Sequence, residues 1–471
     1  MMTSLISLLS WSHLLSMLAI SSAFHPPCHR LPPLTTNQLR QRQLQSSQSK
    51  LHQYSPAAAA TIDISENAPR DIDSLSAWAT NYGIQISDCF ELTYSNEEVG
   101  DVHAITNRDL PADNPIVLVP AELIMTGGKS RQEIGTEATR AEQTLMLSDH
   151  NSFYLFLKVL KEYELGEQST WYYYLNSLPR YYSNGASMTD FCFGCLPPYA
   201  ATQAQEEKNR LKRFELALNE VTTFLSDETK RNSDLVKWAF NVVHTRYQET
   251  TGGDYALIPM ADMFNHGGAD YVDAYISYDD EGNCYAYSTR DVPAGRPLKV
   301  CYGDPTNPSK LLARYGFLDE SSSATFCKWM AEEPSSELYQ LGYPNQMLFY
   351  NDGSISNEVW DCLLYEELGN QSPAEQQQFH QACMVGDEAT KAGYHDQYFP
   401  QTLSALREHV AFILNELEEL ATWQQSVQDK ERHADLDATR HPRLPLIKRH
   451  NEFVKYSFQL VQQNLDAMVS S

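Results

Sequence analysis

The chain has 471 residues and a formal net charge of -26, from 61 acidic and 35 basic side chains. This length predicts two or three domains with ample apolar material for a core. Such an acidic chain excludes non-specific binding to nucleic acid phosphate, which needs a basic surface, and favours basic protein partners. After the N-terminal region, no segment is long and apolar enough for a membrane helix, so no stable membrane anchor is expected.

Residues 1–62 differ from the rest of the chain, and the first acidic residue is Asp63. The apolar run from Leu14 to Ile20 is too short to span a bilayer and is typical of a signal peptide. The stretch that follows, up to Gln53, is rich in Ser, Gln, Arg and Pro and free of acids, as transit peptides are. The two parts together resemble a bipartite plastid presequence, so plastid targeting is expected. The alternatives are a secretory signal and a disordered N-terminus on a cytoplasmic protein.

The first predicted elements are short. Asp71–Tyr82 predicts a helix that ends at Gly83, and Val102–Ala104 and Ile116–Val119 predict strands.

Two local motifs give weak signals. Gly127-Gly128-Lys129-Ser130 resembles the end of a phosphate-binding loop, but Leu123 stands where such a loop needs a glycine, so a surface turn is expected. The pair Cys192 and Cys195 has no second pair and no nearby histidine ligands. Structural thiols are therefore expected there, with a metal or redox role as the alternative.

Apolar residues then repeat at helical spacing in three stretches. They are Phe153, Phe156, Leu157 and Leu160; Leu211, Phe214, Leu218, Val221 and Leu225; and Leu235, Trp238 and Val242. From Ala256 the pattern changes: residues 273–278 and 284–289 alternate around an acidic turn, which predicts a hairpin. This turn lacks the length and the final Glu of a calcium loop. After about Ala331, long amphipathic helices are predicted near 403–420 and 447–468.

The most unusual residues lie in Leu257–Leu318. An apolar run ends in Asn265-His266, which is a polar anchor for a bound molecule, and Tyr302 and Tyr315 are each followed by a glycine. Phenol groups thus stand beside backbone that a ligand can approach closely. Taken singly, these residues are more often a polar turn and core aromatics, and Arg246 is more often a surface cation. Their order and spacing together favour a functional site.

Three segments of this stretch carry a resemblance to a known family. They are Leu257-Ile258-Pro259-Met260-Ala261-Asp262-Met263-Phe264-Asn265-His266, then Tyr302-Gly303, then Leu311-Leu312-Ala313-Arg314-Tyr315-Gly316-Phe317. The combination closely resembles SET-domain methyltransferases of the Rubisco large-subunit lysine methyltransferase subgroup, whose relatives include an actin-histidine methyltransferase. Trp171 with Leu178-Pro179-Arg180, and Val243-His244-Thr245-Arg246, are similar to further segments of this subgroup.

The resemblance covers roughly residues 75–470 and implies an α+β fold. A SET β-fold would occupy residues 75–318, with a helical insert at about 145–250. An all-helical substrate-binding domain would follow at 331–471, and residues 1–62 would be the presequence. The subgroup has no cysteine-rich zinc cluster after the SET domain, so no metal is implied.

The resemblance also implies S-adenosylmethionine as the cofactor. Asn265 and His266 would hold it, and Arg246 would lie near its carboxylate, where a bidentate guanidinium fits. Asp262 would support this binding. Tyr302 would contact the cofactor as well.

For the acceptor, the resemblance implies a protein amine. Tyr302 would be the catalytic tyrosine, and Tyr315 would line the substrate-amine pocket. Methyl transfer to an amine is a direct displacement, so the enzyme mainly aligns and desolvates the reactants. The amine must be neutral, and tyrosine hydroxyls, which are neutral at pH 7, can orient it.

One departure from the subgroup concerns the cofactor pocket. A Gly-x-Gly pair usually lets backbone approach the cofactor, and here Val99 and Asp101 replace both glycines. Their side chains would crowd the pocket, unless a shift of one residue lets Gly100 serve. Asp101 would also bring a carboxylate near the methionine amine.

The sequence therefore predicts a protein-lysine N-methyltransferase that uses S-adenosylmethionine and modifies a non-histone, plastid protein. Two alternatives remain open. One is a SET-like protein that binds a polypeptide without methylating it, and the other is a protein-histidine methyltransferase.

Overall fold

The structure, a computed structural model, describes residues 61–96, 101–268, 271–329, 336–431 and 441–470. Residues 1–60, which hold nearly all of the predicted presequence, lie outside the described residues, as do Val99 and Gly100. None of the helices in the described ranges is long and apolar enough to cross a membrane.

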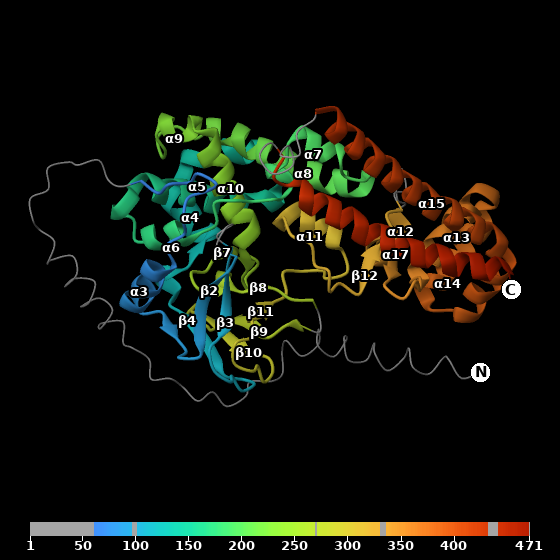
Figure 1. Ribbon diagram of the computed structural model, residues 1–471, viewed down its shortest axis with the longest axis horizontal. Coiled ribbons are helices and arrows are strands. Elements are labelled where there is room, and N and C mark those ends of the chain that lie inside the picture. The colour runs from blue at the N-terminus through green and yellow to red at the C-terminus, as the bar shows by residue number, and fades with distance from the viewer. Residues whose placement is uncertain (1–60, 97–100, 269–270, 330–335, 432–440, 471) are drawn as a thin grey trace, which may run out of the picture. The chain divides into compact units, whose positions relative to one another are not determined.

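The strands form several small sheets, seen in the lower part of Figure 1. The largest sheet of the described residues is antiparallel, in the order β1-β4-β10-β9, and a second has the order β5-β7-β6. The pairs β2–β3 and β12–β13 are antiparallel, and β8–β11 is parallel. The bounds are β1 Gln85–Ile86, β2 Phe90–Asn96, β3 Asp101–Thr106, β4 Pro115–Val119, β5 Met125–Thr126, β6 Gln248–Glu249, β7 Tyr255–Leu257, β8 Asn265–His266, β9 Ala274–Tyr278, β10 Cys284–Ser288, β11 Lys299–Val300, β12 Ala324–Phe326 and β13 Leu348–Tyr350.

The predicted hairpin is confirmed as β9 and β10. Tyr287 lies opposite Tyr275, and Ala286 lies opposite Ile276. This register turns Ala286 into the core and the two tyrosine rings toward solvent, where they stack 5.5 Å apart. The alternation of small and aromatic residues therefore corresponds to a sheet with one face toward the core and one toward solvent, as expected for a period of two.

The first helix shows how local signals place an element. The side chain of Asp71 accepts a hydrogen bond from the Ser74 amide, which caps the start of α3 (Ile72–Tyr82). Gly83 ends the helix at φ 92°, in the left-handed region that glycine adopts readily. Leu75 and Trp78 are buried. This predicted helix is confirmed.

The surface turn predicted at 127–130 is wrong, because these residues form the first turn of α4 (Gly127–Ile134). The Thr126 hydroxyl caps the helix, and the Gly128 amide donates to Asp254 Oδ2 at 2.8 Å. A carboxylate of the chain thus binds where a phosphate would lie in a phosphate loop. A Cβ on Gly127 would come within 2.7 Å of the Asn151 carbonyl oxygen, so glycine is needed for close packing.

The helices predicted between the two groups of strands are confirmed, except that α8 ends at Asn219, before the predicted helical positions Val221 and Leu225. Their core is a chain of aromatic rings, since Phe153 of α5 lies 5.3 Å from Phe214 of α8, which lies 5.3 Å from Phe240 of α10. All three rings are completely buried. The bounds are α5 His150–Leu165, α6 Tyr172–Ser177, α7 Asp190–Gly194, α8 Pro198–Asn219, α9 Asp227–Arg231 and α10 Ser233–Arg246.

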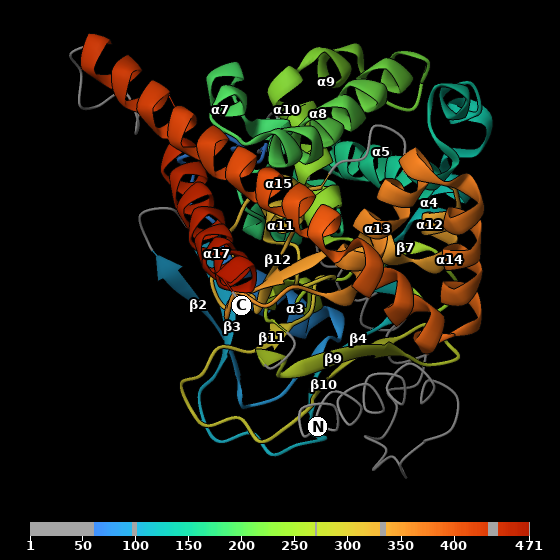
Figure 2. The ribbon, with the colours of Figure 1, turned by 90° about the vertical axis from the view of Figure 1, so that its right-hand side faces the viewer.

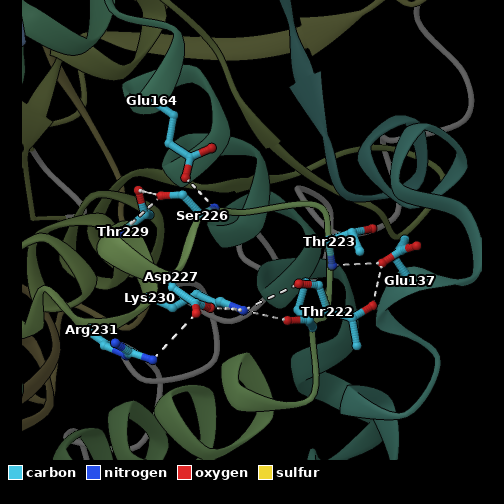
Figure 3. A network of polar contacts seen from close by, with 10 residues as sticks. Glu137, Glu164, Thr222, Thr223, Ser226, Asp227, Thr229, Lys230 and Arg231 are labelled. Carbon is cyan, nitrogen blue, oxygen red and sulfur yellow. Dashed lines mark hydrogen bonds and ion pairs between the residues drawn. The ribbon is translucent and has the colours of Figure 1, made fainter.

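A polar network on the outer side of this helical layer ties α9 to its neighbours (Figure 3). Glu164, at the end of α5, accepts a hydrogen bond from the Ser226 amide at 2.7 Å. Glu137 accepts from the Thr222 hydroxyl at 2.8 Å and from the Thr223 amide at 3.1 Å. The network therefore anchors the connection between α8 and α9 to two earlier parts of the chain.

The C-terminal part has its own core, which includes Phe349, Leu406, Val454 and Phe458. The helices α15 and α17 lie side by side in both views (Figures 1 and 2), and Arg407 of α15 pairs with Asp466 of α17 at 2.7 Å. The strand β13, which pairs with β12, was not predicted. The bounds are α11 Pro308–Tyr315, α12 Ser336–Leu341, α13 Asn357–Gln371, α14 Pro373–Val385, α15 Glu388–Glu431 and α17 Leu444–Ser470.

A third, smaller core joins the two parts. Cys192 and Cys195 are completely buried there with Leu312 of α11 and Leu444 of α17. Neither cysteine forms a disulfide in the described part of the chain, and both pack as small apolar groups. Among the described residues, no group of three or more His, Cys, Asp and Glu side chains could hold a metal ion.

Candidate functional site

A cavity of about 660 Å³ lies where α10, α11, β7, β9 and β11 meet. It brings together four of the six predicted site residues: Arg246, Asp262, Tyr302 and Tyr315. The rest of its lining combines apolar and aromatic side chains with the polar residues Gln248, Glu249 and Arg314. A cavity where a few polar groups converge among apolar and aromatic side chains is the usual form of a binding site.

Tyr302 follows β11 and is held at both ends by the motif that leads into β8, through Phe264 and His266. Its hydroxyl donates to the Phe264 carbonyl oxygen at 2.6 Å, and its amide donates to His266 Nδ1 at 3.2 Å. Burial raises the pKa of the Tyr302 hydroxyl above its ordinary value, although Arg246 opposes the shift. The site therefore holds a neutral phenol in one orientation.

Tyr315 lies beside Tyr302, with ring centroids 5.1 Å apart. Its hydroxyl donates to the Tyr302 carbonyl oxygen at 3.1 Å. Tyr315 is the last residue of α11, and Gly316 ends that helix at φ 80°. A Cβ at Gly316 would come within 2.7 Å of the Asn184 amide nitrogen, so glycine at this position sets where Tyr315 stands.

Arg246 and Asp262 form an ion pair in the wall of the cavity. Arg246 Nη1 donates to the Asp262 carbonyl oxygen at 2.7 Å and lies 3.3 Å from Asp262 Oδ2. The same carboxylate oxygen accepts from the Tyr174 hydroxyl at 2.6 Å. Burial alone would lower the pKa of Arg246, but Asp262 raises it above its ordinary value, so Arg246 is a permanent cation.

The backbone that presents Asp262 is strained. Met260, two residues earlier, is completely buried at φ 70°, a region that residues with a side chain seldom adopt. It leads into a short 3₁₀ turn, Ala261–Met263. Such strain persists only where the surrounding packing over-determines it, and it concentrates at functional sites.

Asn265 and His266, the other two predicted site residues, form β8 and do not line the cavity. They stand behind Tyr302, because β8 pairs with β11 and His266 accepts the Tyr302 amide proton. His266 Nε2 lies 3.4 Å from Asp319 Oδ2. Burial lowers the pKa of His266, so its ring is neutral at pH 7.

Arg70 and Tyr182 belong to the same region, although no sequence motif pointed to either residue. Arg70 is buried, and its Nη2 lies 3.7 Å from Met263 Sδ. Burial and the neighbouring charge of Arg246 lower the pKa of Arg70 to about 9. Within the described residues, neither the buried Tyr182 hydroxyl nor Arg246 Nε has a hydrogen-bond partner. Buried polar atoms without partners indicate a place for a ligand.

Arg180, which belongs to a segment of the resemblance, supports the backbone. Its guanidinium donates to the carbonyl oxygens of Asp63, Leu178 and Asn176 at 2.7–2.9 Å. Asp101 begins β3, and after burial its charge is among the causes that raise the pKa of Tyr302. The carboxylate thus stands near the site.

Comparison with known proteins places the chain near a group of methyltransferases. No family model matches it. The chain is 24% identical over 325 residues to the actin-histidine N-methyltransferase of Rattus norvegicus, across 62% of this chain and 53% of the relative. It is 24% identical over 282 residues to the actin-histidine N-methyltransferase of Mus musculus, across 57% and 46%. The chain spans about half the length of the curated relatives it matches.

Solved structures give the fold. The SET domain of LSMT bound to lysine and AdoHcy is similar with a TM-score of 0.59 at 15% identity, over 84% of this chain and 91% of that one. Rubisco LSMT bound to AdoMet is similar with a TM-score of 0.58 at 16% identity, over 84% and 92%. The chain has the SET fold of LSMT. The predicted α+β fold and its resemblance to SET-domain methyltransferases are confirmed at this level.

Proposed function

We propose that this chain is a protein methyltransferase that uses S-adenosylmethionine. The observation that carries the proposal is Tyr302. This partly buried tyrosine, with a neutral phenol, is held by two hydrogen bonds at the wall of a cavity, next to a second tyrosine and the Arg246–Asp262 ion pair. Such a site aligns and desolvates an amine, which is the task of an enzyme for methyl transfer.

The residues next to Tyr302 fit the cofactor. The side chains of Arg70, Arg180 and Arg246 bring three positive charges around Tyr182, and such a cluster favours an added anion. The carboxylate of the methionine moiety is such an anion. When bound, S-adenosylmethionine supplies an electrophilic methyl group on a sulfonium. We assign Arg246 and Arg70 to its carboxylate, and Asp262 holds Arg246 in place.

Asn265 and His266 have a less direct part in this proposal than the resemblance implies. His266 fixes the backbone at Tyr302, and Asn265 pairs opposite Lys299 in the parallel ladder. We propose that the two residues shape the cofactor side of the site through this ladder. Asp101, at the start of β3, would favour the positive ammonium of the methionine moiety.

For the acceptor, we propose a lysine amine of a protein. The hydroxyls of Tyr302 and Tyr315 both donate to backbone carbonyl oxygens, so their oxygen lone pairs remain available to an incoming amine. Lone pairs orient an amine by accepting its N–H bonds and leave its own lone pair free for attack. Apolar surroundings favour the neutral amine over the ammonium.

Histidine is the second candidate acceptor, because the curated relatives are actin-histidine methyltransferases. An imidazole nitrogen is already neutral at pH 7, so it needs no loss of a proton. Mass spectrometry of methylated peptides from a plastid or whole-cell extract would distinguish the two. Methyl groups found only on histidine would overturn the assignment to lysine.

The plastid is the proposed location of the substrate. The support is the composition of residues 1–62 alone. A fusion of these residues to a fluorescent protein, expressed in algal cells, should enter the plastid. Fluorescence outside the plastid would contradict this.

The proposal as a whole is tested by cofactor binding and methyl transfer. The purified chain should bind S-adenosylmethionine in calorimetry and transfer labelled methyl groups to protein in an extract. A folded chain that binds a polypeptide but no cofactor would favour the alternative, a SET-like binding protein without catalysis.

A further inference from the structure

We propose that Arg443 is a positioning residue for the cofactor site. It lies at the start of α17 and holds Tyr182 and Arg70 in position. This inference rests on the proposed function. Arg443 lies immediately before α17, far in the sequence from both residues, and is only 6% exposed.

The first set of contacts joins Arg443 to the segment that carries Tyr182. Arg443 Nε donates to the Tyr182 carbonyl oxygen at 3.0 Å. The guanidinium lies over the Tyr181 ring, 4.4 Å from its centroid, and the Tyr181 hydroxyl donates to the Pro442 carbonyl oxygen at 2.9 Å. Tyr181 and Tyr182 are thus attached to their neighbours Pro442 and Arg443. Such a double attachment fixes the Tyr182 backbone in position and direction.

The Tyr182 side chain points from this attachment toward the cofactor cluster, which consists of Arg70, Arg180 and Arg246. It is 8% exposed, and its hydroxyl is a buried atom without a hydrogen-bond partner in the described part of the chain. Burial raises the pKa of Tyr182, while the charges of Arg246, Arg70 and Arg180 oppose the shift. A neutral hydroxyl therefore stands among three guanidinium groups.

The second set of contacts runs through the segment before α3. Arg443 Nη2 pairs with Glu66 Oε1, and Arg443 is almost fully buried where the pair forms. Four residues later, Arg70 Nε donates to the Ser177 carbonyl oxygen at 2.6 Å, which aims its Nη2 at Met263 Sδ. Both segments that contact Arg443 therefore end in the cofactor cluster. Through these contacts, the position of the start of α17 affects the affinity for the cofactor.

The control for this inference lies on the same helix. Arg449 of α17 pairs with Glu320 at 2.6 Å, but both side chains are more than half exposed. This pair also joins α17 to the earlier part of the chain, without contacting either segment of the cofactor cluster. An exposed pair contributes little to stability.

The experiment measures cofactor binding by calorimetry on the full chain, with folding checked by circular dichroism. Arg443→Met should weaken binding of S-adenosylmethionine about tenfold, a change of about 1.4 kcal/mol. The KM for the cofactor should rise while kcat at saturation stays within about twofold. Arg449→Met should bind as the wild type does. Arg443→Lys should recover part of the loss, since it keeps the pair with Glu66 and loses the bond to Tyr182.

A double variant separates positioning from a general loss of structure. Tyr182→Phe removes only the hydroxyl and should weaken binding by itself. If Arg443 acts through Tyr182, the Arg443→Met/Tyr182→Phe double variant binds more tightly than the sum of the two single losses predicts. Additive losses, or a folded Arg443→Met variant with wild-type affinity, would overturn the inference. If Arg443→Met does not fold, Glu66→Gln and Arg443→Lys with unchanged affinity would overturn it. A wild-type chain that binds no cofactor would instead overturn the proposed function.

Discussion

Two buried cations of this protein are held in different ways. Arg246, in the wall of the cavity, faces the carboxylate of Asp262 at 3.3 Å. Lys328, near the start of α17, donates from Nζ to Ser309 Oγ at 2.7 Å and lies 4.9 Å from the Tyr199 ring. His450 Nε2 forms a hydrogen bond with the same Ser309 hydroxyl at 2.9 Å. In the described ranges, no carboxylate forms an ion pair with Lys328.

The difference shows what a buried carboxylate does for a cation. Asp262 raises the pKa of Arg246 despite burial, and burial lowers the pKa of Lys328 to about 7. Arg246 thus keeps its charge at any pH the protein meets, while Lys328 titrates near neutrality. A site that must hold an anion needs the first arrangement.

The largest expected effect comes from removing the paired cation. Arg246→Met leaves the Asp262 carboxylate buried without its partner and should lower the free energy of unfolding by about 3–5 kcal/mol. Lys328→Met removes a buried cation and leaves no unpaired charge behind, so it should not lower that free energy by a comparable amount at pH 7. Urea unfolding of both variants measures the contrast. Equal losses would show that the two cations are held alike.

The next effect separates chemistry from stability within the cavity. Tyr302→Phe keeps the ring and loses the bond to the Phe264 carbonyl oxygen. Turnover should fall by about 10²-fold or more, because the acceptor loses its alignment, while stability falls by only about 1 kcal/mol. Methyl-transfer rates at saturating cofactor and a thermal melt check the two parts. Wild-type turnover in this variant would contradict the role of Tyr302.

The pH dependence of stability tests the second cation. The pKa of Lys328 is about 7 in the folded chain and about 10.4 when unfolded. Between these values the unfolded state binds the extra proton, so the free energy of unfolding rises with pH from about 7 to 10, by up to about 1.4 kcal/mol per unit. Burial, with the charge of Lys328, lowers the pKa of the facing His450 to about 3, so His450 stays neutral in this window.

Lys328→Met is the matched variant for that measurement. The difference in unfolding free energy between wild type and variant should change with pH in this window. A difference that stays constant from pH 7 to 10 would mean that Lys328 keeps its proton throughout.

The smallest effect concerns a carboxylate beside a neutral base. Asp319 lies 3.4 Å from His266 Nε2, and Ser321 donates its hydroxyl to Asp319 Oδ1 at 2.6 Å. Asp319→Asn should free His266 to change tautomer and loosen its bond from the Tyr302 amide, which lowers turnover about three- to tenfold. Steady-state kinetics measures this, with Ser321→Ala as the milder companion. Unchanged kinetics would limit His266 to packing.

Local patterns predicted much of the fold. The cap at Asp71, the alternation around 279–283 and the helical spacing from Phe153 onward each placed an element correctly. These signals succeed because each lies within one element. The turn predicted at 127–130 failed because close packing of Gly127 on Asn151 is a contact between elements.

The predicted site residues likewise fall into two groups in the structure. Tyr302, Tyr315, Arg246 and Asp262 were found in the sequence because their motifs resemble a known family, and the structure gathers them in one cavity. Asn265 and His266 come from the same motif, yet they lie behind Tyr302 and outside that cavity. The pairing of β8 with β11 decides this, and a motif does not show which of its residues will face a ligand.

By itself, the sequence determined the α+β order of elements, the motifs around 257–318 and the acidic character of the chain. Only the tertiary structure decided which cations are paired, and that Arg70, Tyr182 and Arg443 meet near one site. The physical reason is separation along the chain. A buried charge is governed by the groups packed around it, and the groups that hold Arg70 and Arg443 come from segments more than a hundred residues away, which no local pattern records.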